Sequence, residues 1–314
     1  MWKPIHLVPP NTRIDFMRWH KAALVVAVIM TLGSIGLVAV KGLNFGIDFA
    51  GGIVMEVRAQ QAPDLGDMRE KLDGLGVGEV ALQTFGDPNT VLIRLPQQEG
   101  GEAAQQTAIS KVRGELGEGW EYRRTETVGP KVGAELVKNA IIAVALAMVG
   151  IFVYVWVRYA WQFGMNALLA MVHDVVTTVG LFSLFGLQFD LATVAAVLTV
   201  AGYSVNDKVV VFDRIRFEMR RYKTMPMGDV INLSVNETLS RTTVTAGLTM
   251  LSVVALFLFG GEVLRGFAIA LIWGIFIGTY SSICIAAAGL LNLRHSKIRG
   301  EDDTAKPSKA AGEA

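Results

Sequence analysis

Six apolar stretches, each long enough to cross a bilayer as a helix, constrain what this chain of 314 residues can fold into. A bilayer core of about 30 Å needs roughly 20 consecutive apolar residues in a helix. The composition agrees, because 52% of the residues are hydrophobic and only 18% are charged. The sequence therefore predicts a polytopic α-helical membrane protein with six transmembrane helices, at residues 22–40, 136–157, 163–186, 190–212, 242–261 and 267–291.

The lysines and arginines between these stretches indicate the orientation. They gather in the N-terminal segment 1–21, in a basic loop at 213–241 and in a polar tail at 292–314, whereas the loops at 186–190 and 261–266 carry almost none. Because cations favour the cytoplasmic side, both termini are expected in the cytoplasm, and the polar tail is expected to be disordered. The first stretch is too long for a signal peptide and lacks a small-x-small cleavage site, so we predict an uncleaved anchor.

One soluble insert, residues 41–135, is then extracytoplasmic. Its pattern predicts strands at 52–59, 79–85, 90–95 and 120–128 and helices at 63–76 and 102–116, with a GDPN turn at 86–89. The order βαββαβ is that of the split-βαβ, or ferredoxin-like, fold. The predicted fold class is thus six transmembrane helices with one small α+β extracytoplasmic domain.

Motifs of common enzyme sites are missing from the sequence. It contains no GxxxxGK[ST] loop for nucleotide phosphates, no HExxH and no CxxC. The four histidines are scattered, and the single cysteine, Cys284, lies in a predicted span. We therefore predict a protein that is not an enzyme and has no cofactor, no metal site and no nucleic-acid partner.

Asp207 and Lys208 interrupt the fourth apolar stretch. Counted from Leu191, Asp207 lies about 24 Å along the helix, in the cytoplasmic third of the bilayer. One interpretation is that the two charges mark the point where the helix leaves the lipid, with Lys208 reaching the interface. The apolar run VVVF at 209–212 favours the alternative, an intramembrane carboxylate that faces the interior of the bundle.

A second carboxylate, Asp174, follows His173 near the middle of the third stretch. A charge at this depth costs at least about 2.5 to 3.5 kcal/mol, so such residues usually serve ion or proton pathways. A protonated, hydrogen-bonded structural Asp174 is the alternative. Arg241 stands at the start of the fifth stretch, at a depth similar to that of Asp207. Pairing would hold Asp207 ionised and separation would favour its protonation, which outlines a proton switch.

The sixth stretch carries small residues at every fourth position. Such a stripe lets another helix approach closely, so it predicts helix packing and no chemistry. Its members are Gly266, Ala270, Gly274, Gly278 and Ser282.

Four longer motifs resemble one known family. They are GLNFGIDFAGG at 42–52, VGPKVGAEL at 128–136, LLAMVHDV at 168–175 and GYSVNDKVVVFDRIR at 202–216. Together and in this order they resemble the SecF branch of the SecD/SecF family of protein-export membrane proteins, over about residues 40–291. That family belongs with the resistance-nodulation-division exporters, whose membrane parts have twelve helices in two similar halves.

The resemblance implies a subunit that uses the proton motive force to drive late stages of protein export, in the bacterial inner membrane. The partners that it implies are a SecD-like six-helix subunit, the SecYEG channel, unfolded preprotein clients and membrane lipid. It further implies that Asp207 and Arg241 are the proton-relay residues and that Asp174 takes part in proton coupling. Supporting roles are assigned to His173, Asn206, Lys208 and Asp213. Lys208 stands where the family more often has a hydroxyl residue, so its effect on the charge of Asp207 is open.

Two other functions stay open at this point. One is a proton-driven small-molecule exporter of the same superfamily, which the single small insert disfavours. The other is a structural scaffold of the translocon that does not couple to ions, and mutation of Asp207 separates it from the proton-driven subunit. Sodium could also replace the proton as the coupling ion.

Overall fold

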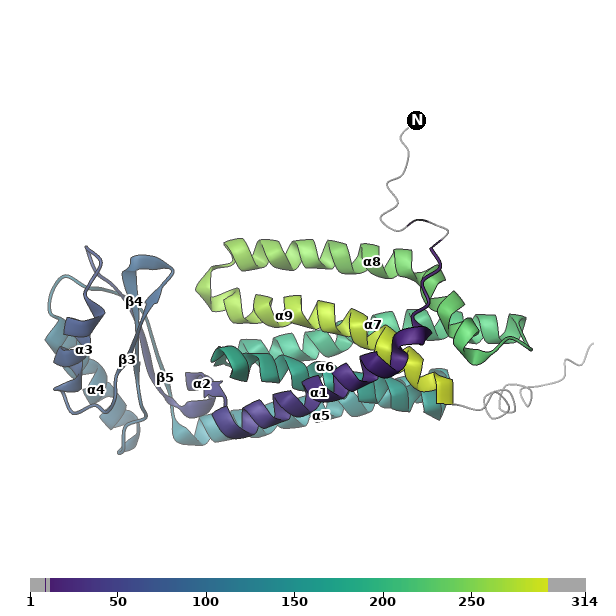
Figure 1. Ribbon diagram of the computed structural model, residues 1–314. Helices are drawn as coiled ribbons and strands as arrows, with labels where there is room; N and C mark the ends of the chain where they lie inside the picture. The colour runs from purple at the N-terminus through teal and green to yellow at the C-terminus, as the bar shows by residue number, and fades with distance from the viewer. Residues whose placement is uncertain (1–8, 10–11, 293–314) are drawn as a thin grey trace, which may run out of the picture.

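The computed structural model describes residue 9 and residues 12–292, which form a long helical bundle with a small α+β domain at one end (Figure 1). Within that range six helices are long and apolar enough to cross a membrane, which confirms the predicted fold class. These six are α1 (His20–Lys41), α5 (Pro130–Arg158), α6 (Trp161–Phe185), α7 (Leu191–Arg221), α8 (Met227–Phe259) and α9 (Gly261–Ser281). Nearly all of the predicted tail 292–314 and much of the segment 1–21 lie outside the described residues.

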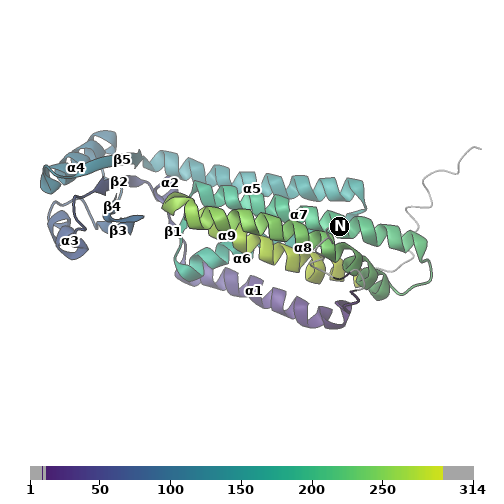
Figure 2. The same cartoon turned by 90° about the horizontal axis from the view of Figure 1, so that it is seen from above.

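Three of these helices form the centre of the bundle. Half or more of the most apolar stretch of α6, α7 and α9 is buried, against 6% to 11% in α1, α5 and α8. Seen from above, α1 and α5 lie at opposite edges of the bundle (Figure 2). Polar groups on α6, α7 and α9 are therefore shielded by protein, whereas α1, α5 and α8 expose most of their apolar surface.

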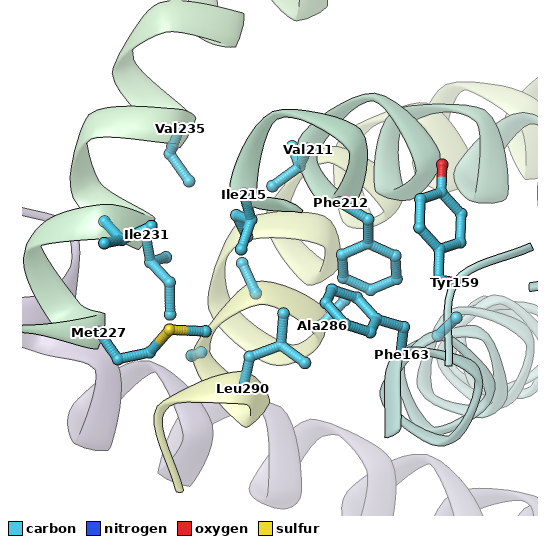
Figure 3. Close-up of a cluster of buried hydrophobic side chains, with 14 of the residues drawn as sticks. Tyr159, Phe163, Val211, Phe212, Ile215, Met227, Ile231, Val235, Ala286 and Leu290 are labelled. Atoms are coloured by element: carbon cyan, nitrogen blue, oxygen red, sulfur yellow. The ribbon is translucent and has the colours of Figure 1, made fainter. Parts of the chain in front are cut away.

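The segment predicted as a basic loop, 213–241, is helical except for residues 222–226. Its charges pair along and between the two helices: Arg214 lies 2.6 Å from Glu218 on α7 and 2.5 Å from Glu237 on α8. Pairs at this helical spacing stabilise helices. The opposite face is apolar and joins a buried cluster with the turn between α5 and α6 and the segment 282–292 that follows α9 (Figure 3). Labelled members of this cluster are Tyr159, Phe163, Val211, Phe212, Ile215, Met227, Ile231, Val235, Ala286 and Leu290.

The soluble domain has a four-stranded antiparallel sheet in the order β3-β4-β2-β5. Its elements are β2 (Gly52–Arg58), α3 (Leu65–Asp73), β3 (Ala81–Phe85), β4 (Asp87–Leu95), α4 (Gly101–Leu116) and β5 (Glu121–Val128). Buried residues alternate along β4 at Val91, Ile93 and Leu95, because successive side chains of a strand point to opposite faces. They pack under α3 and α4, which cover the face away from the bundle (Figure 1).

A short joint between the domain and the bundle has no counterpart in the predicted elements. It consists of β1 (Asn44–Phe45), α2 (Ile47–Ala50) and β6 (Gln188–Phe189), with β1 and β6 paired in parallel. The Asp48 carboxylate accepts a hydrogen bond of 3.0 Å from the Leu191 N–H at the start of α7. At Gly52, with φ of +119°, an added Cβ would lie 2.5 Å from the Leu95 carbonyl oxygen, so only glycine fits there.

Arg94 on β4 connects this joint to the sheet of the soluble domain. Its guanidinium donates to the Gln188 side chain, and its Nε is buried without a hydrogen-bond partner among the described residues. Burial lowers the pKa of Arg94, and the nearby Asp190 carboxylate offsets part of that effect. The Asp190 carboxylate also caps α7 by accepting from the Thr193 N–H, so the domain rests directly on the end of α7.

Candidate functional site

A buried ion pair joins α6 to α7 in the centre of the bundle. Lys208 Nζ lies 3.0 Å from Asp174 Oδ2, and both side chains are 0% exposed. Ser204 Oγ and Ser281 Oγ donate to the same carboxylate oxygen over 2.6 Å and 2.8 Å. Lys208 in turn donates to Ser281 Oγ over 3.0 Å and to Ser204 Oγ. A buried charge pair is tolerated when its remaining hydrogen-bonding capacity is satisfied, as it is here.

Helical spacing explains how these four side chains meet. Ser204 and Lys208 are four residues apart on α7 and therefore lie on one face. That face meets α9 where Gly278 allows close approach, since an added Cβ there would lie 3.0 Å from Ser204 Oγ. Ser281 is the last residue of α9, which continues as a π-helical segment, Ser282–Ala287. Such wider turns occur often at functional sites.

His173 completes the cluster from the side of α6. Its Nδ1 lies 3.1 Å from Asp174 Oδ1, and its ring centroid lies 6.2 Å from that of Tyr280. The imidazole is buried, and its Nε2 has no hydrogen-bond partner within the described part of the chain. With Asp174 ionised, the Nδ1 atom is the donor in this contact.

Asp207 lies on a different side of α7 from Lys208. Its side chain is 2% exposed, and its Oδ2 has no hydrogen-bond partner among the described residues. It borders a cavity of about 10 Å³ between α7, α8 and α9. The other residues around this cavity are Val211, Val235, Thr238, Leu239, Thr242, Thr279, Ser282 and Ile283. Such a cavity accommodates about one water molecule, so the carboxylate has little solvation.

Arg241 is exposed on α8. In the described range no ion pair joins it to Asp207, although the two groups are close enough to interact electrostatically. Arg241, Asn206 and Asp213 line an open hollow of about 1220 Å³ at the end of the bundle remote from the soluble domain. Asp213 pairs there with Arg158 over 3.3 Å. Thr238 borders both this hollow and the Asp207 cavity, so a single layer of side chains separates the two.

The stripe of small residues on α9 faces α7. An added Cβ at Gly274 would lie 2.6 Å from Val200 Cγ1, and one at Gly266 would lie 3.7 Å from Thr193 Oγ1. Ala270 and Ser282 of the same stripe are buried. The stripe thus brings α9 close enough for Ser281 to contact a pair formed by α6 and α7.

Ser204 and Ser281 were not singled out from the sequence. Small hydroxyl residues are common at helix contacts in membranes, so neither gives a signal on its own. The spacing of Ser204 four residues before a lysine inside an apolar helix is the signal that identifies one of them. Across the described residues, no group of three or more His, Cys, Asp or Glu side chains is placed to hold a metal ion.

The two carboxylates therefore have contrasting environments. Asp174 receives a cation and two hydroxyl donors, whereas Asp207 has an unsatisfied oxygen beside a small cavity. A carboxylate with little solvation and no direct ion-pair partner is one whose proton affinity responds to small movements of its neighbours. The arrangement suits reversible protonation.

Comparison with known proteins gives consistent similarities. Residues 108–296 match the family "Protein export membrane protein SecD/SecF, C-terminal", and residues 36–63 match "SecD/SecF GG Motif". The Protein translocase subunit SecF of Rhodobacter capsulatus is 46% identical over 297 residues, covering 90% of this chain and 89% of that protein. The same subunit of Rickettsia rickettsii is 46% identical over 288 residues, covering 90% and 93%.

Solved structures give the same result. The crystal structure of SecDF, a translocon-associated membrane protein from Thermus thermophilus, superposes with a TM-score of 0.81 at 35% identity. A SecDF structure in a super-membrane-facing form superposes with a TM-score of 0.70 at 35% identity. The present chain is covered to 92% and 97% in these superpositions but spans only 39% and 42% of the SecDF chains.

Proposed function

This chain belongs to the SecD/SecF family of protein-export membrane proteins, and on that basis we propose that it uses the proton motive force to drive late stages of protein export. It is a multi-pass membrane protein and a transport component, the SecF subunit of a Sec translocase, rather than an enzyme. The observation that carries the proposal is Asp207, a buried carboxylate in a spanning helix with an unsatisfied oxygen.

The partner of this subunit follows from the size of SecDF. Because the chain spans 39% of that protein, most of SecDF has no counterpart here. We assign the remainder to a SecD-like subunit that completes a twelve-helix assembly with this one. The pair then acts beside the SecYEG channel on unfolded preproteins that leave it.

The orientation rests on the distribution of cations. The hollow lined by Arg241 lies at the end of the bundle where the lysines and arginines gather, which we assign to the cytoplasm of a bacterial inner membrane. Both termini then lie in the cytoplasm and the soluble domain outside. Asp207 exchanges its proton with the cytoplasmic side through the thin layer at Thr238.

The cost of an ionised carboxylate in the membrane is similar in size to the energy that the membrane potential supplies. An ionised carboxylate costs about 2.5 to 3.5 kcal/mol at the bilayer centre, which sets an upper value for Asp207 in the cytoplasmic third. The membrane potential supplies about 2.3 kcal/mol per charge for each 100 mV. Protonation of Asp207 therefore changes the packing free energy of α7 against α8 and α9 by an amount that one or two protons can provide. In the ionised state Arg241 turns inward to pair with Asp207, and in the protonated state it stays at the hollow.

The joint passes this movement to the soluble domain. Helix α7 runs unbroken from its cap at Asp190 to Asp207 and beyond. At its first residue it is tied to Asp48, and Arg94 contacts Gln188 just before it. A shift of α7 is therefore transmitted to the sheet, which moves relative to the membrane and to the emerging preprotein.

Substitution of Asp207 tests the proposal. Asp207→Asn keeps shape and hydrogen bonding but cannot ionise, so we expect normal assembly with the SecD-like partner and loss of uncoupler-sensitive export of a secreted preprotein. Arg241→Met should fail in the same way, because Asp207 would then stay protonated. The matched control is Asp229→Asn, an exposed carboxylate at the start of α8, which should keep export. Wild-type export and uncoupler sensitivity in both test variants would favour a structural scaffold. Export that depends on a sodium gradient would show that sodium, and not the proton, is the coupling ion.

A further inference from the structure

The buried lysine of α7 uses all of its hydrogen-bonding capacity. An ammonium group has three donors. Lys208 Nζ directs them to Asp174 Oδ2 and Ser281 Oγ, each at 3.0 Å, and to Ser204 Oγ. The side chain is 0% exposed, so no water or lipid phosphate competes for these donors. Lys208 is therefore held inside the bundle and does not reach for the membrane interface.

Both oxygens of the Asp174 carboxylate also have hydrogen-bond partners. Asp174 Oδ2 accepts from Lys208, Ser204 and Ser281, and Oδ1 faces His173 Nδ1. A proton on either oxygen would displace one of these donors and would leave the ammonium buried without a counter-ion. Breaking a buried pair by neutralising one member is strongly unfavourable. The geometry thus favours a permanently charged Asp174.

We infer that Lys208 is a positioning residue that keeps Asp174 ionised and in a fixed place between α6, α7 and α9. Asp207 is then the carboxylate that binds and releases the proton. This inference rests on the proposed proton coupling and assigns it to one of the two candidate carboxylates. Asp174 then lies outside the path of the transferred proton. Lys208, for which the family resemblance implied only an unspecified supporting role, is given a defined one.

The two consecutive charges on α7 do not compete for the same neighbours. Consecutive residues of a helix point about 100° apart. Lys208 faces His173 and Asp174 of α6 and Ser281 of α9, with Tyr280 beside the imidazole. Asp207 faces the cavity with Thr279 of α9, Ser282 of the π-helical segment and Thr238 of α8. The charged or titratable groups that act on it are Lys208, Arg241 and Tyr203.

Charge balance leads to a specific expectation for variants. The Asp174–Lys208 pair has no net charge, so removing both charges together leaves the net charge of the bundle interior unchanged. Removing only the cation leaves Asp174 buried and unpaired, and it then becomes protonated. Lys208→Met should therefore disturb coupling, whereas Asp174→Asn/Lys208→Met should restore much of it.

Infrared spectroscopy of the complete complex, reconstituted with its SecD-like partner, gives the direct readout. At neutral pH the difference spectrum between wild type and Asp174→Asn/Lys208→Met should contain ionised carboxylate bands and no protonated carboxyl band. Lys208→Met, if it assembles, should gain a protonated carboxyl band that the double variant lacks. A protonated carboxyl band in wild type that disappears in the double variant would overturn the inference. A purely structural lysine would not change these bands.

Export by the same variants supplies the second readout. We expect Lys208→Met to lower the uncoupler-sensitive export rate by about tenfold or more, and the double variant to regain a rate within about threefold of wild type. The control is Lys138→Met, which removes a lysine exposed on α5. A double variant that assembles but loses coupling as completely as Asp207→Asn would show that Asp174 itself carries the proton. If Asp207→Asn keeps coupling, the proposed function fails, while the infrared result still decides whether Asp174 is fixed.

Discussion

A close approach between two central helices gives a quantitative test of the bundle. Gly274 of α9 packs against Val200 of α7, which is 1% exposed. A Cβ at position 274 would lie 2.6 Å from Val200 Cγ1 and 2.9 Å from its Cβ, and closer still to Cγ2. A valine side chain in a helix has one strongly preferred rotamer and cannot turn away. Gly274→Ala therefore forces α7 and α9 apart.

Two opposing terms set the size of the effect. Overpacking a buried contact costs about 1 to 3 kcal/mol. Alanine returns about 1 kcal/mol of helix propensity relative to glycine. The net loss in the free energy of unfolding should be about 0 to 2 kcal/mol relative to wild type. Val200→Ala removes the clashing methyl groups, so Val200→Ala/Gly274→Ala should be more stable than the sum of the single effects by about 1 kcal/mol or more.

Denaturant-induced unfolding of the purified protein in mild detergent measures these differences. The matched control is Gly247→Ala on α8, where an added Cβ meets nothing within 4 Å. This control should be as stable as wild type or slightly more stable. The packing argument would be wrong if Gly274→Ala matched Gly247→Ala in stability, or if the two substitutions in the double variant were simply additive.

Three further outcomes are expected. In a Cys284→Ser background, impermeant thiol reagents added to whole cells should label a cysteine at Asn89 and not one at Lys223, and labelling at Lys223 would overturn the orientation. Residues 42–133 expressed alone should show a cooperative but weakly stable melt by circular dichroism, because a domain of this size buries only about 60 to 65% of its surface; a melt without cooperativity would argue against an independent domain. Arg94→Met should leave the melt of the isolated domain nearly unchanged but should increase protease cleavage between the domain and the bundle in the whole protein. Cleavage equal to that of wild type would show that the contact with Gln188 does not hold the domain.

Most of the architecture follows from periodic patterns in the sequence. The six spans are recognisable because lipid demands about 20 apolar residues per helix, and the βαββαβ order is recognisable from strand alternation and turn residues. The sequence predicts a loop at 213–241, where α7 and α8 in fact remain helical over most of the segment, because dense charges usually indicate a loop. Here the charges instead pair along and between the helices, as Arg214 does with Glu218 and Glu237. The joint was missed because β1 and β6 have two residues each, too few to form a pattern.

The site was only partly predictable for a geometric reason. Sequence places Asp174, Asp207 and Lys208 within spans but does not give the rotation of each helix about its axis. That rotation directs Lys208 toward Asp174 and Asp207 toward the cavity, and it leaves Arg241 at the hollow instead of paired with Asp207. The serines that complete the cluster resemble ordinary packing residues until α6, α7 and α9 are placed side by side.

Proton movement through the reconstituted complex tests the central claim most directly. The complex of this subunit with its SecD-like partner is placed in vesicles with a pH-sensitive dye inside, a membrane potential is imposed, and dye response is followed while an unfolded preprotein is bound. The account predicts preprotein-dependent proton flux with the wild-type subunit and none with Asp207→Asn, at equal amounts of assembled complex. Flux through Asp207→Asn at the wild-type rate would show that Asp207 does not carry the proton and would contradict the account.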